Sequence, residues 1–170
     1  DDKKDRFARL YGPRPDGGFA EIPSLLNLRY DRPHPMMSGG GGLVSTATDY
    51  LRFALALANG GAWGGVRLLG RKTLELMTIN HLPATLLPYQ APPTTFHGYG
   101  FGLGFAVLMD LAAAQTPGSV GCFGWSGAAS TDFWVDPRED LVALLMPQVM
   151  PQPYGPINRE FRTMVYQALV

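Results

Sequence analysis

Apolar residues recur with helical spacing in the first half of the chain and with a spacing of two in much of the second half. The most apolar helical segment covers residues 46–59, where Thr46 and Asp49 form a capping pair and two glycines at 60–61 provide the stop. Nearly all of its other positions are apolar, which predicts a helix buried on nearly every side. Such a helix needs more neighbours than we expect this chain to supply.

Two further helices are predicted. Residues 71–79 have helical spacing, with Leu74, Leu76 and Met77 expected to face inward. Residues 157–170 form an amphipathic C-terminal helix that should lie across a sheet. Its predicted apolar face comprises Ile157, Phe161, Met164, Val165 and Ala168, whereas Arg159, Glu160, Arg162 and Gln167 lie elsewhere.

From residue 98 the period of two predicts strands. Between residues 98 and 109 large side chains alternate with small ones, which predicts a strand with one bare face. A bare face allows close approach either by a packed element or by a ligand. Further along, residues 131–136, a turn at 136–140 and an apolar run at 141–146 predict a buried hairpin.

Together these elements predict an α+β fold: an antiparallel sheet with a C-terminal helix packed on it, plus a small helical segment. We expect three parts, an irregular surface excursion with a Gly-rich turn at 1–45, the helical segment at 46–97, and the sheet with its helix at 98–170. The 21 glycines and 15 prolines predict many loops, among them 11–35, 110–118 and 147–156.

The charge pattern narrows the class of partner. Fourteen basic and fourteen acidic residues cancel, and neither sign forms a long run, so the chain lacks the footprint of a nucleic-acid or anionic-membrane binder. No stretch approaches the roughly 20 apolar residues of a membrane span. The composition therefore favours a small-molecule or protein partner.

Several single features have an ordinary structural interpretation. Cys122 is the sole cysteine and is interpreted as a buried strand residue, because aromatic neighbours offer no cation to stabilise a thiolate. His34, His81 and His97 each lack a second ligand at metal-binding spacing, so we expect turn or surface positions and no metal. The glycines at 39–42 lack the Lys-Ser/Thr of a phosphate loop and predict a tight turn.

The candidate chemistry lies at the head of the predicted hairpin, in Trp125, Ser126, Gly127 and Ala128. This tetrad resembles the third motif of the penicillin-recognising serine hydrolases, Lys-Thr-Gly in β-lactamases, in the Trp-x-Gly form of β-lactamase-like esterases. The resemblance extends to residues 38–46, 77–83 and 98–104 and so covers most of the chain. It implies part of a β-lactamase/transpeptidase-like fold of the class C β-lactamase or family VIII esterase type.

The resemblance also implies a division of roles. Such enzymes carry their nucleophile in Ser-x-x-Lys, and no serine here is followed three residues later by lysine. The chain thus resembles a C-terminal half, and we expect the N-terminal half of the same enzyme as its partner, in the cytoplasm or periplasm of a bacterium. By the resemblance, the Ala128 backbone N–H belongs to an oxyanion hole, and Trp125, Ser126 and Gly127 bind a small-molecule ester or lactam without a cofactor.

Two residues of the tetrad need a separate interpretation. Ser126 superficially resembles a nucleophile elbow, but a β-prone segment follows it and no histidine lies downstream, so we expect it not to be the nucleophile. Trp125 replaces the family's lysine, which removes a counter-charge for a carboxylate and favours neutral acyl esters.

Two other functions compete with that of an enzyme half. One is a non-catalytic binding or interaction module of the same fold, and the other is an incomplete chain without independent function.

Overall fold

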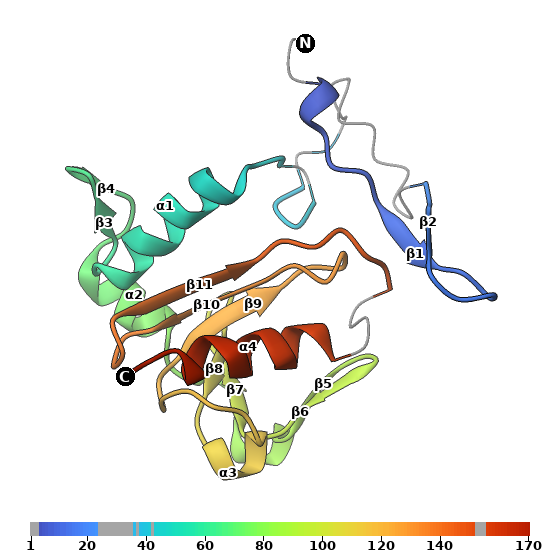
Figure 1. Ribbon diagram of the computed structural model, residues 1–170. Coiled ribbons are helices and arrows are strands. Elements are labelled where there is room, and N and C mark those ends of the chain that lie inside the picture. The colour runs from blue at the N-terminus through green and yellow to red at the C-terminus, as the bar shows by residue number, and fades with distance from the viewer. Residues whose placement is uncertain (1–3, 24–35, 37, 42, 152–155) are drawn as a thin grey trace.

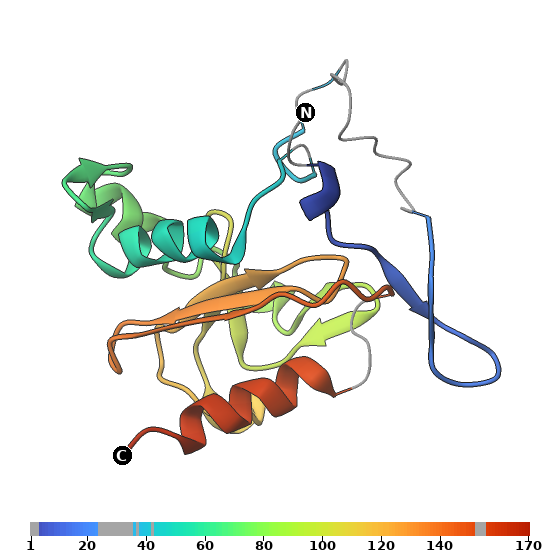
Figure 2. The same cartoon turned by 45° about the horizontal axis from the view of Figure 1, so that its top comes forward.

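A five-stranded antiparallel sheet forms the centre of the computed structural model, which describes residues 4–23, 36, 38–41, 43–151 and 156–170. Helix α1 (Ala47–Ala58) covers one face of the sheet and helix α4 (Ile157–Gln167) covers the other (Figures 1 and 2). In spatial order the strands are β11 (Leu141–Leu145), β10 (Asp132–Asp136), β9 (Phe123–Ser126), β8 (Ala106–Leu108) and β7 (Tyr99–Phe101). The predicted α+β class is confirmed.

Smaller elements surround this sandwich of helix, sheet and helix. Three two-stranded hairpins are β1 (Tyr11–Pro13) with β2 (Phe19–Glu21), β3 (Ala62–Trp63) with β4 (Val66–Arg67), and β5 (Tyr89–Ala91) with β6 (Thr94–Phe96). Two short helices are α2 (Arg71–Met77) and α3 (Leu111–Ala114), and two 3-10 turns are η1 (Lys4–Arg6) and η2 (Ala84–Leu86).

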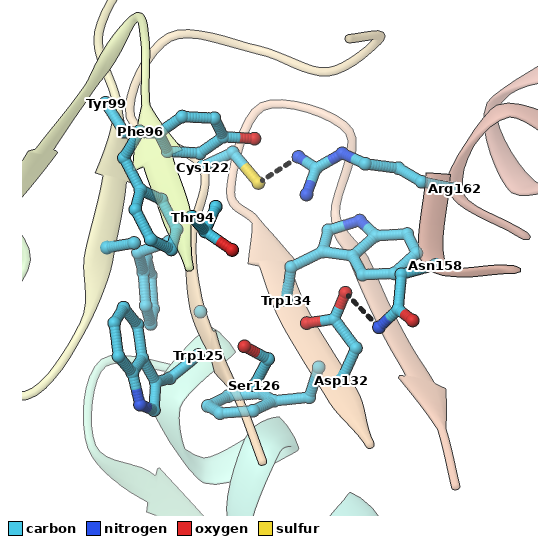
Figure 3. A pocket seen from close by; sticks show the side chains of 14 residues that line it. Thr94, Phe96, Tyr99, Cys122, Trp125, Ser126, Asp132, Trp134, Asn158 and Arg162 are labelled. Carbon is cyan, nitrogen blue, oxygen red and sulfur yellow. Dashed lines mark hydrogen bonds between the residues drawn. The ribbon is translucent and has the colours of Figure 1, made fainter. Parts of the chain in front are cut away.

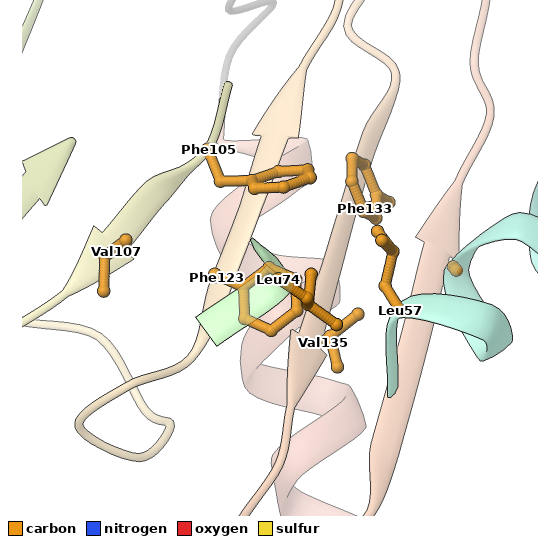
Figure 4. Packing of buried hydrophobic residues seen from close by; sticks show 8 residues of the cluster. Leu57, Leu74, Phe105, Val107, Phe123, Phe133 and Val135 are labelled. Carbon is orange, nitrogen blue, oxygen red and sulfur yellow. The ribbon is translucent and has the colours of Figure 1, made fainter. Parts of the chain in front are cut away.

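The two faces of β10 belong to two separate cores, because side chains alternate along a strand. Phe133 and Val135 point toward α1, where they pack with Leu57 and Phe123 (Figure 4). Trp134 points toward α4 and packs with partly buried side chains of that helix. The predicted hairpin of β10 and β11 is confirmed, with paired residues from Asp132↔Leu145 to Asp136↔Leu141.

Helix α1 begins and ends close to the predicted positions. The Thr46 hydroxyl accepts a hydrogen bond from the Asp49 N–H at 3.1 Å, as expected of an N-cap. Within the described residues, however, this helix buries only Ala54, Ala56 and Leu57, and Leu51 and Phe53 are each 37% exposed. As expected, this chain does not supply enough neighbours to bury the helix on nearly every side, because one sheet face covers only one side of the helix.

The predicted single strand at 98–109 is wrong. The chain reverses between Phe101 and Ala106 and forms β7 and β8, paired from Tyr99↔Leu108 to Phe101↔Ala106. The glycines serve close packing of protein on protein: a Cβ at Gly102 would lie 2.0 Å from the Met77 carbonyl oxygen, and one at Gly100 would lie 2.4 Å from Asn80 Oδ1. Of the two readings of the bare face, the packed element is the correct one.

Other local predictions need correction. The supposed loop at 110–118 contains α3, whose N-cap Asp110 accepts from the Ala113 N–H. The region 11–35 is not wholly irregular, since β1 and β2 pair there, and residues 24–35 lie outside the described part. In α2, Leu74 is buried but Leu76 is 50% exposed, because two positions along a helix rotate a side chain to nearly the opposite face.

The face of α4 that meets the sheet is more polar than its apolar stripe predicted. Phe161 and Val165 pack against the sheet as expected, but Met164 is 67% exposed and Ile157 38%. Arg162, predicted to lie elsewhere, instead places its guanidinium 4.8 Å from the Trp134 ring centroid. Stacking on an aromatic face stabilises a cation, so an arginine can occupy a helix face that meets aromatic rings.

The exposed apolar face of α1 generates a prediction for the 170-residue chain. Phe53→Ala should lower hydrophobic-dye binding and self-association, and should reduce the free energy of unfolding less than the loss of a fully buried ring does, since Phe53 is 37% exposed. Phe133→Ala is the matched control. That ring is 4% exposed, so its loss should reduce stability by about 3 to 5 kcal/mol. Equal losses in urea unfolding of the two variants would contradict this assignment of the α1 surface.

Candidate functional site

The residues Trp125 to Ala128 lie where β9 extends beyond its neighbour. Strand β8 pairs with β9 only at Ala106↔Gly124 and Val107↔Phe123. On the other side, β10 continues to pair up to Ser126, and the Gly127 N–H donates to the Thr131 carbonyl at 2.8 Å. Because backbone groups alternate between the two edges of a strand, the amide of Ser126 points to the edge that β8 leaves open.

A tight turn follows β9 and holds Ala128 at the surface. The Ser130 N–H donates to the Gly127 carbonyl at 3.0 Å, and Ser130 has a left-handed backbone with φ of 64°. A Cβ at Gly127 would lie 2.3 Å from Thr131 Oγ1, so a larger residue there would displace the Thr131 hydroxyl. Within the described part of the chain, the N–H of exposed Ala128 has no acceptor. This donor is free to bind a ligand.

Aromatic stacking fixes the position of Trp125. Its ring is stacked on Phe96 with centroids 5.7 Å apart, and Phe96 is in turn stacked on Tyr89 at 4.7 Å. Phe101 meets the Trp125 ring edge-on at 5.0 Å. One side of Trp125 therefore belongs to an aromatic stack from the β5–β6 hairpin, and its ring forms an apolar wall beside the open edge of β9.

Two hollows adjoin the tetrad. The hairpin groove, of about 650 Å³, is lined by Leu82, Leu86, Pro88, Tyr89, Phe101 and Trp125. The α4 pocket, of about 190 Å³, lies on the other side of β9 beneath helix α4. Its aromatic walls include Phe96, Tyr99, Trp125 and Trp134 (Figure 3). Its polar side chains come from β6, β9, β10 and α4 and from the residue before β9, namely Thr94, Ser126, Asp132, Asn158, Arg162 and Cys122.

Asp132 faces the α4 pocket directly opposite Ser126. The two residues are cross-strand partners in the β9–β10 register, so their side chains project from the same face of the sheet. The Asp132 carboxylate accepts one hydrogen bond from Asn158 Nδ2 at 3.3 Å. Burial raises the pKa of Asp132 to about 6, against the opposing effects of Asn158 and Arg162. Carboxyl groups shifted in this way are frequent at functional sites.

The surroundings of Cys122 differ from the sequence-based interpretation. The residue is buried as expected, 2% exposed, but it immediately precedes β9 instead of lying within it. The expected lack of a nearby cation is wrong, because Arg162 Nη2 donates to Cys122 Sγ at 3.1 Å. Burial nevertheless raises the pKa of the Cys122 thiol, outweighing the guanidinium, which lowers it. The thiol therefore stays protonated near neutral pH.

Sequence reasoning found the tetrad but missed the pocket behind it. The signal for Asp132 was available, since a two-residue alternation through a tight hairpin places it on the Ser126 face. Asn158 and Arg162 are four residues apart on one helix and therefore share a face, but the sequence does not indicate which sheet residues they meet. Of the histidines, His81 and His97 lie exposed in the structure, and His34 falls outside the described residues.

With this fold and site, comparison with known proteins identifies the class. The family model described as Beta-lactamase matches residues 1–165. The chain therefore belongs to the beta-lactamase family, which agrees with the resemblance carried by the tetrad and the segments before it. Its membership of the β-lactamase-like hydrolases and esterases rests on this match together with the relatives below.

Two curated relatives show sequence similarity. Protein Rv1367c of Mycobacterium tuberculosis is 37% identical over 123 residues, which cover 70% of this chain and 31% of that protein. Esterase EstB of Burkholderia gladioli is 31% identical over 163 residues, which cover 91% of this chain and 36% of EstB. The chain thus spans about a third of the length of these relatives.

Two solved structures share the fold. Simvastatin synthase LovD from Aspergillus terreus superposes with a TM-score of 0.78 at 22% identity, covering 97% of this chain and 43% of LovD. EstCE1, a hydrolase with promiscuous acyltransferase activity, superposes with a TM-score of 0.72 at 24% identity, covering 95% of this chain and 44% of EstCE1.

In the described residues, no helix is long and apolar enough to cross a membrane.

The raised pKa of Asp132 predicts a pH dependence of stability. Well below pH 3.8 the carboxyl is neutral in both folded and unfolded chains. As pH rises from the ordinary value of 3.8 toward about 6, the unfolded chain loses its proton first, so this group lowers the stability of the folded state. Asp132→Asn should therefore gain stability relative to wild type as pH rises, by about 2 to 3 kcal/mol above pH 7.

Urea unfolding at pH 4 and pH 7.5 measures this effect. Asp140→Asn is the matched control, because Asp140 is exposed and its left-handed backbone, with φ of 49°, suits asparagine. If the stability difference between Asp132→Asn and wild type is the same at both pH values, Asp132 is not the desolvated carboxyl described above.

Proposed function

We propose that this chain supplies the oxyanion-hole and substrate-wall side of a β-lactamase-like serine esterase. The serine nucleophile and its lysine, in a Ser-x-x-Lys motif, come from outside these 170 residues. The observation that supports this role most directly is the free N–H of Ala128, which a turn holds at the open edge of β9 beside Trp125. The similarity to EstB, named an esterase, supports the choice of ester hydrolysis among the activities of the family.

In the proposed reaction a serine hydroxyl attacks the carbonyl carbon of an ester and forms a tetrahedral intermediate. The carbonyl oxygen becomes an oxyanion, which accepts hydrogen bonds from the Ala128 N–H and from the amide of the nucleophile itself. The lysine takes the proton of the serine hydroxyl and returns it to the departing alcohol. Water then hydrolyses the acyl-enzyme through a second tetrahedral intermediate and regenerates the serine hydroxyl. Gly127 allows the substrate to approach the backbone, and Ser126 donates a hydrogen bond to it.

Trp125 provides the basis for substrate preference. A lysine at this position would provide a counter-charge for a substrate carboxylate, whereas the indole provides an apolar wall. The stacking of Trp125 on Phe96 and its edge contact with Phe101 hold the ring in one place. We therefore assign the site to neutral acyl esters in preference to carboxylate-bearing lactams.

A non-catalytic binding module of the same fold is the second candidate, because no serine in these 170 residues is followed three positions later by lysine. Labelling of the complete protein with a fluorophosphonate decides between them. An enzyme should be labelled on a serine of a Ser-x-x-Lys motif. A folded complete protein that remains unlabelled, and that turns over no nitrophenyl ester, would be a binding module.

The first prediction for the enzyme concerns the Ala128 donor. Ala128→Pro removes the N–H and should lower kcat in the complete enzyme by about 10²- to 10³-fold, the usual loss for one oxyanion-hole donor. Ala128→Gly keeps the N–H and is the matched control, with kcat expected within a few-fold of wild type. Thermal unfolding of both variants separates the lost donor from a disturbed turn. Full activity of a folded Ala128→Pro enzyme would rule out this oxyanion donor.

The second prediction concerns specificity. Trp125→Lys should shift the ratio of kcat/KM values toward a carboxylate-bearing β-lactam and away from a short neutral ester. The expected shift is about ten- to hundredfold, since a charge-assisted hydrogen bond contributes about 1.5 to 3 kcal/mol. Trp63→Lys is the control, because Trp63 lies on β3 and is 45% exposed. An unchanged ratio in Trp125→Lys would reduce Trp125 to a packing residue.

A further inference from the structure

The α4 pocket combines aromatic walls with one carboxylate. Phe96, Tyr99 and Trp125 lie along one side of the pocket in Figure 3, and Trp134 lies across from them. Asp132 and Ser126 project into the space between these walls from the strands β10 and β9. Aromatic faces attract cations through their quadrupole, and a carboxylate provides a counter-ion. This combination is the chemistry that recognises an ammonium group.

Asp132 has no cation of its own. Its carboxylate accepts a hydrogen bond from Asn158 Nδ2 at 3.3 Å, and it forms no salt bridge with any residue that the structure describes. The residue is partly buried, so water compensates the charge only in part. A bound ammonium would supply the missing charge and two or three hydrogen-bond donors.

The nearby cation, Arg162, is directed elsewhere. Its Nε donates to the Pro117 carbonyl at 3.0 Å and its Nη2 donates to Cys122 Sγ, while the guanidinium lies over the Trp134 ring. In Figure 3 the Trp134 indole lies between Arg162 and Asp132. Arg162 thus acts on Asp132 only through space and leaves the carboxylate accessible from the pocket.

The other titratable groups at the pocket carry no charge near neutral pH. Burial raises the pKa of the Tyr99 phenol on β7 and that of the Cys122 thiol ahead of β9. Thr94 on β6, Ser126 on β9 and Asn158 on α4 are polar but uncharged. Among the described residues that line the pocket, Arg162 and Asp132 are therefore the only charged groups, and the Asp132 end is anionic.

We propose that the α4 pocket binds the protonated amino group of a small ligand, with the Asp132 carboxylate as its counter-ion and the surrounding rings as its walls. The volume of about 190 Å³ accommodates a short alkylammonium. Because Ser126 and Trp125 line the pocket, the inference rests on the proposed esterase function in one respect: the ligand's amino group would belong to the ester substrate.

The binding test uses n-butylammonium, with n-butanol as the neutral probe of equal length and butyrate as the anionic one. Titrations followed by the tryptophan indole NMR signals should show binding of n-butylammonium at least tenfold tighter than that of n-butanol, and no measurable binding of butyrate. Asp132→Asn should remove this advantage, whereas Asp140→Asn, at an exposed aspartate, should keep it. Equal affinities for butylammonium and butanol in wild type, or tighter binding of butyrate, would overturn the proposal.

A second measurement needs no variant and so does not depend on the folding of Asp132→Asn. The affinity of wild-type chain for n-butylammonium should rise about tenfold from pH 5 to pH 7 and then level off, because the carboxyl, with a pKa of about 6, must lose its proton to bind a cation. An affinity that is constant or falls over this range would contradict the role of Asp132.

Kinetics of the complete enzyme separate this inference from the proposed function. An ester with an amino group on its acyl chain should be hydrolysed with a higher kcat/KM than its methyl isostere, and Asp132→Asn should abolish the difference. Ammonium binding without any ester turnover would support the pocket and refute the esterase. Turnover of neutral esters without ammonium binding would support the esterase and refute the pocket.

Discussion

The contact between β9 and β10 at Gly124 determines where every part of the candidate site lies. A Cβ at Gly124 would come within 2.0 Å of the Phe133 carbonyl oxygen and 2.8 Å of Trp134 Cα, so the two strands approach more closely than a side chain allows. This approach fixes the pairing of Trp125 with Phe133 and of Ser126 with Asp132. A slip of one residue would reverse the faces of the two side chains on the strand that slips and so separate both pairs. The apolar wall, the α4 pocket and the turn to Ala128 all depend on this register.

The second constraint is the polar attachment of α4 to the sheet. Asp136 is fully buried, and its Oδ2 accepts from the Tyr166 hydroxyl at 2.7 Å and from the Ser119 N–H at 2.9 Å. Its Oδ1 accepts from the Arg138 N–H at 3.1 Å, so both carboxylate oxygens have partners. Tyr166 and Arg162 also lie over the Trp134 ring. These contacts hold the helix over the sheet while leaving the α4 pocket near its first turn.

The sequence predicted those parts of the fold that depend on local periodicity and turn chemistry. The helix over 46–59 has a capping pair at Thr46 and an uninterrupted apolar run, and the hairpin after Thr131 has a Pro-containing turn, so both are nearly as predicted. The strand at 98–109 was wrong because alternation alone does not show a reversal. A glycine at position 102 fits the alternation expected of a strand, and it equally fits the close approach of the Met77 carbonyl oxygen that the structure shows.

The pocket residues were harder to predict, since their role depends on contacts between distant segments. Arg162 is an ordinary surface residue by helical periodicity, and only the position of Trp134 beneath it explains why it turns inward. Asp132 differs from Arg162 in this respect. The tetrad and the tight turn after it determine from which face of the sheet the Asp132 side chain projects. The register of the β9–β10 hairpin places it beside Ser126.

The two proposed determinants of specificity act in the same direction, although they lie on different strands. At Trp125 an indole stands where a lysine would attract a carboxylate, and at Asp132 a carboxylate repels one. Both residues disfavour an anionic substrate. Asp132 also attracts a cationic group through its charge, which Trp125 does not. Repulsion of the wrong ligand and attraction of the right one contribute separately to discrimination. Because Asp132 ionises only above about pH 6, its contribution depends on pH, whereas the indole's does not. A substrate preference that changes with pH would therefore come from the pocket, and one that persists at low pH would come from Trp125.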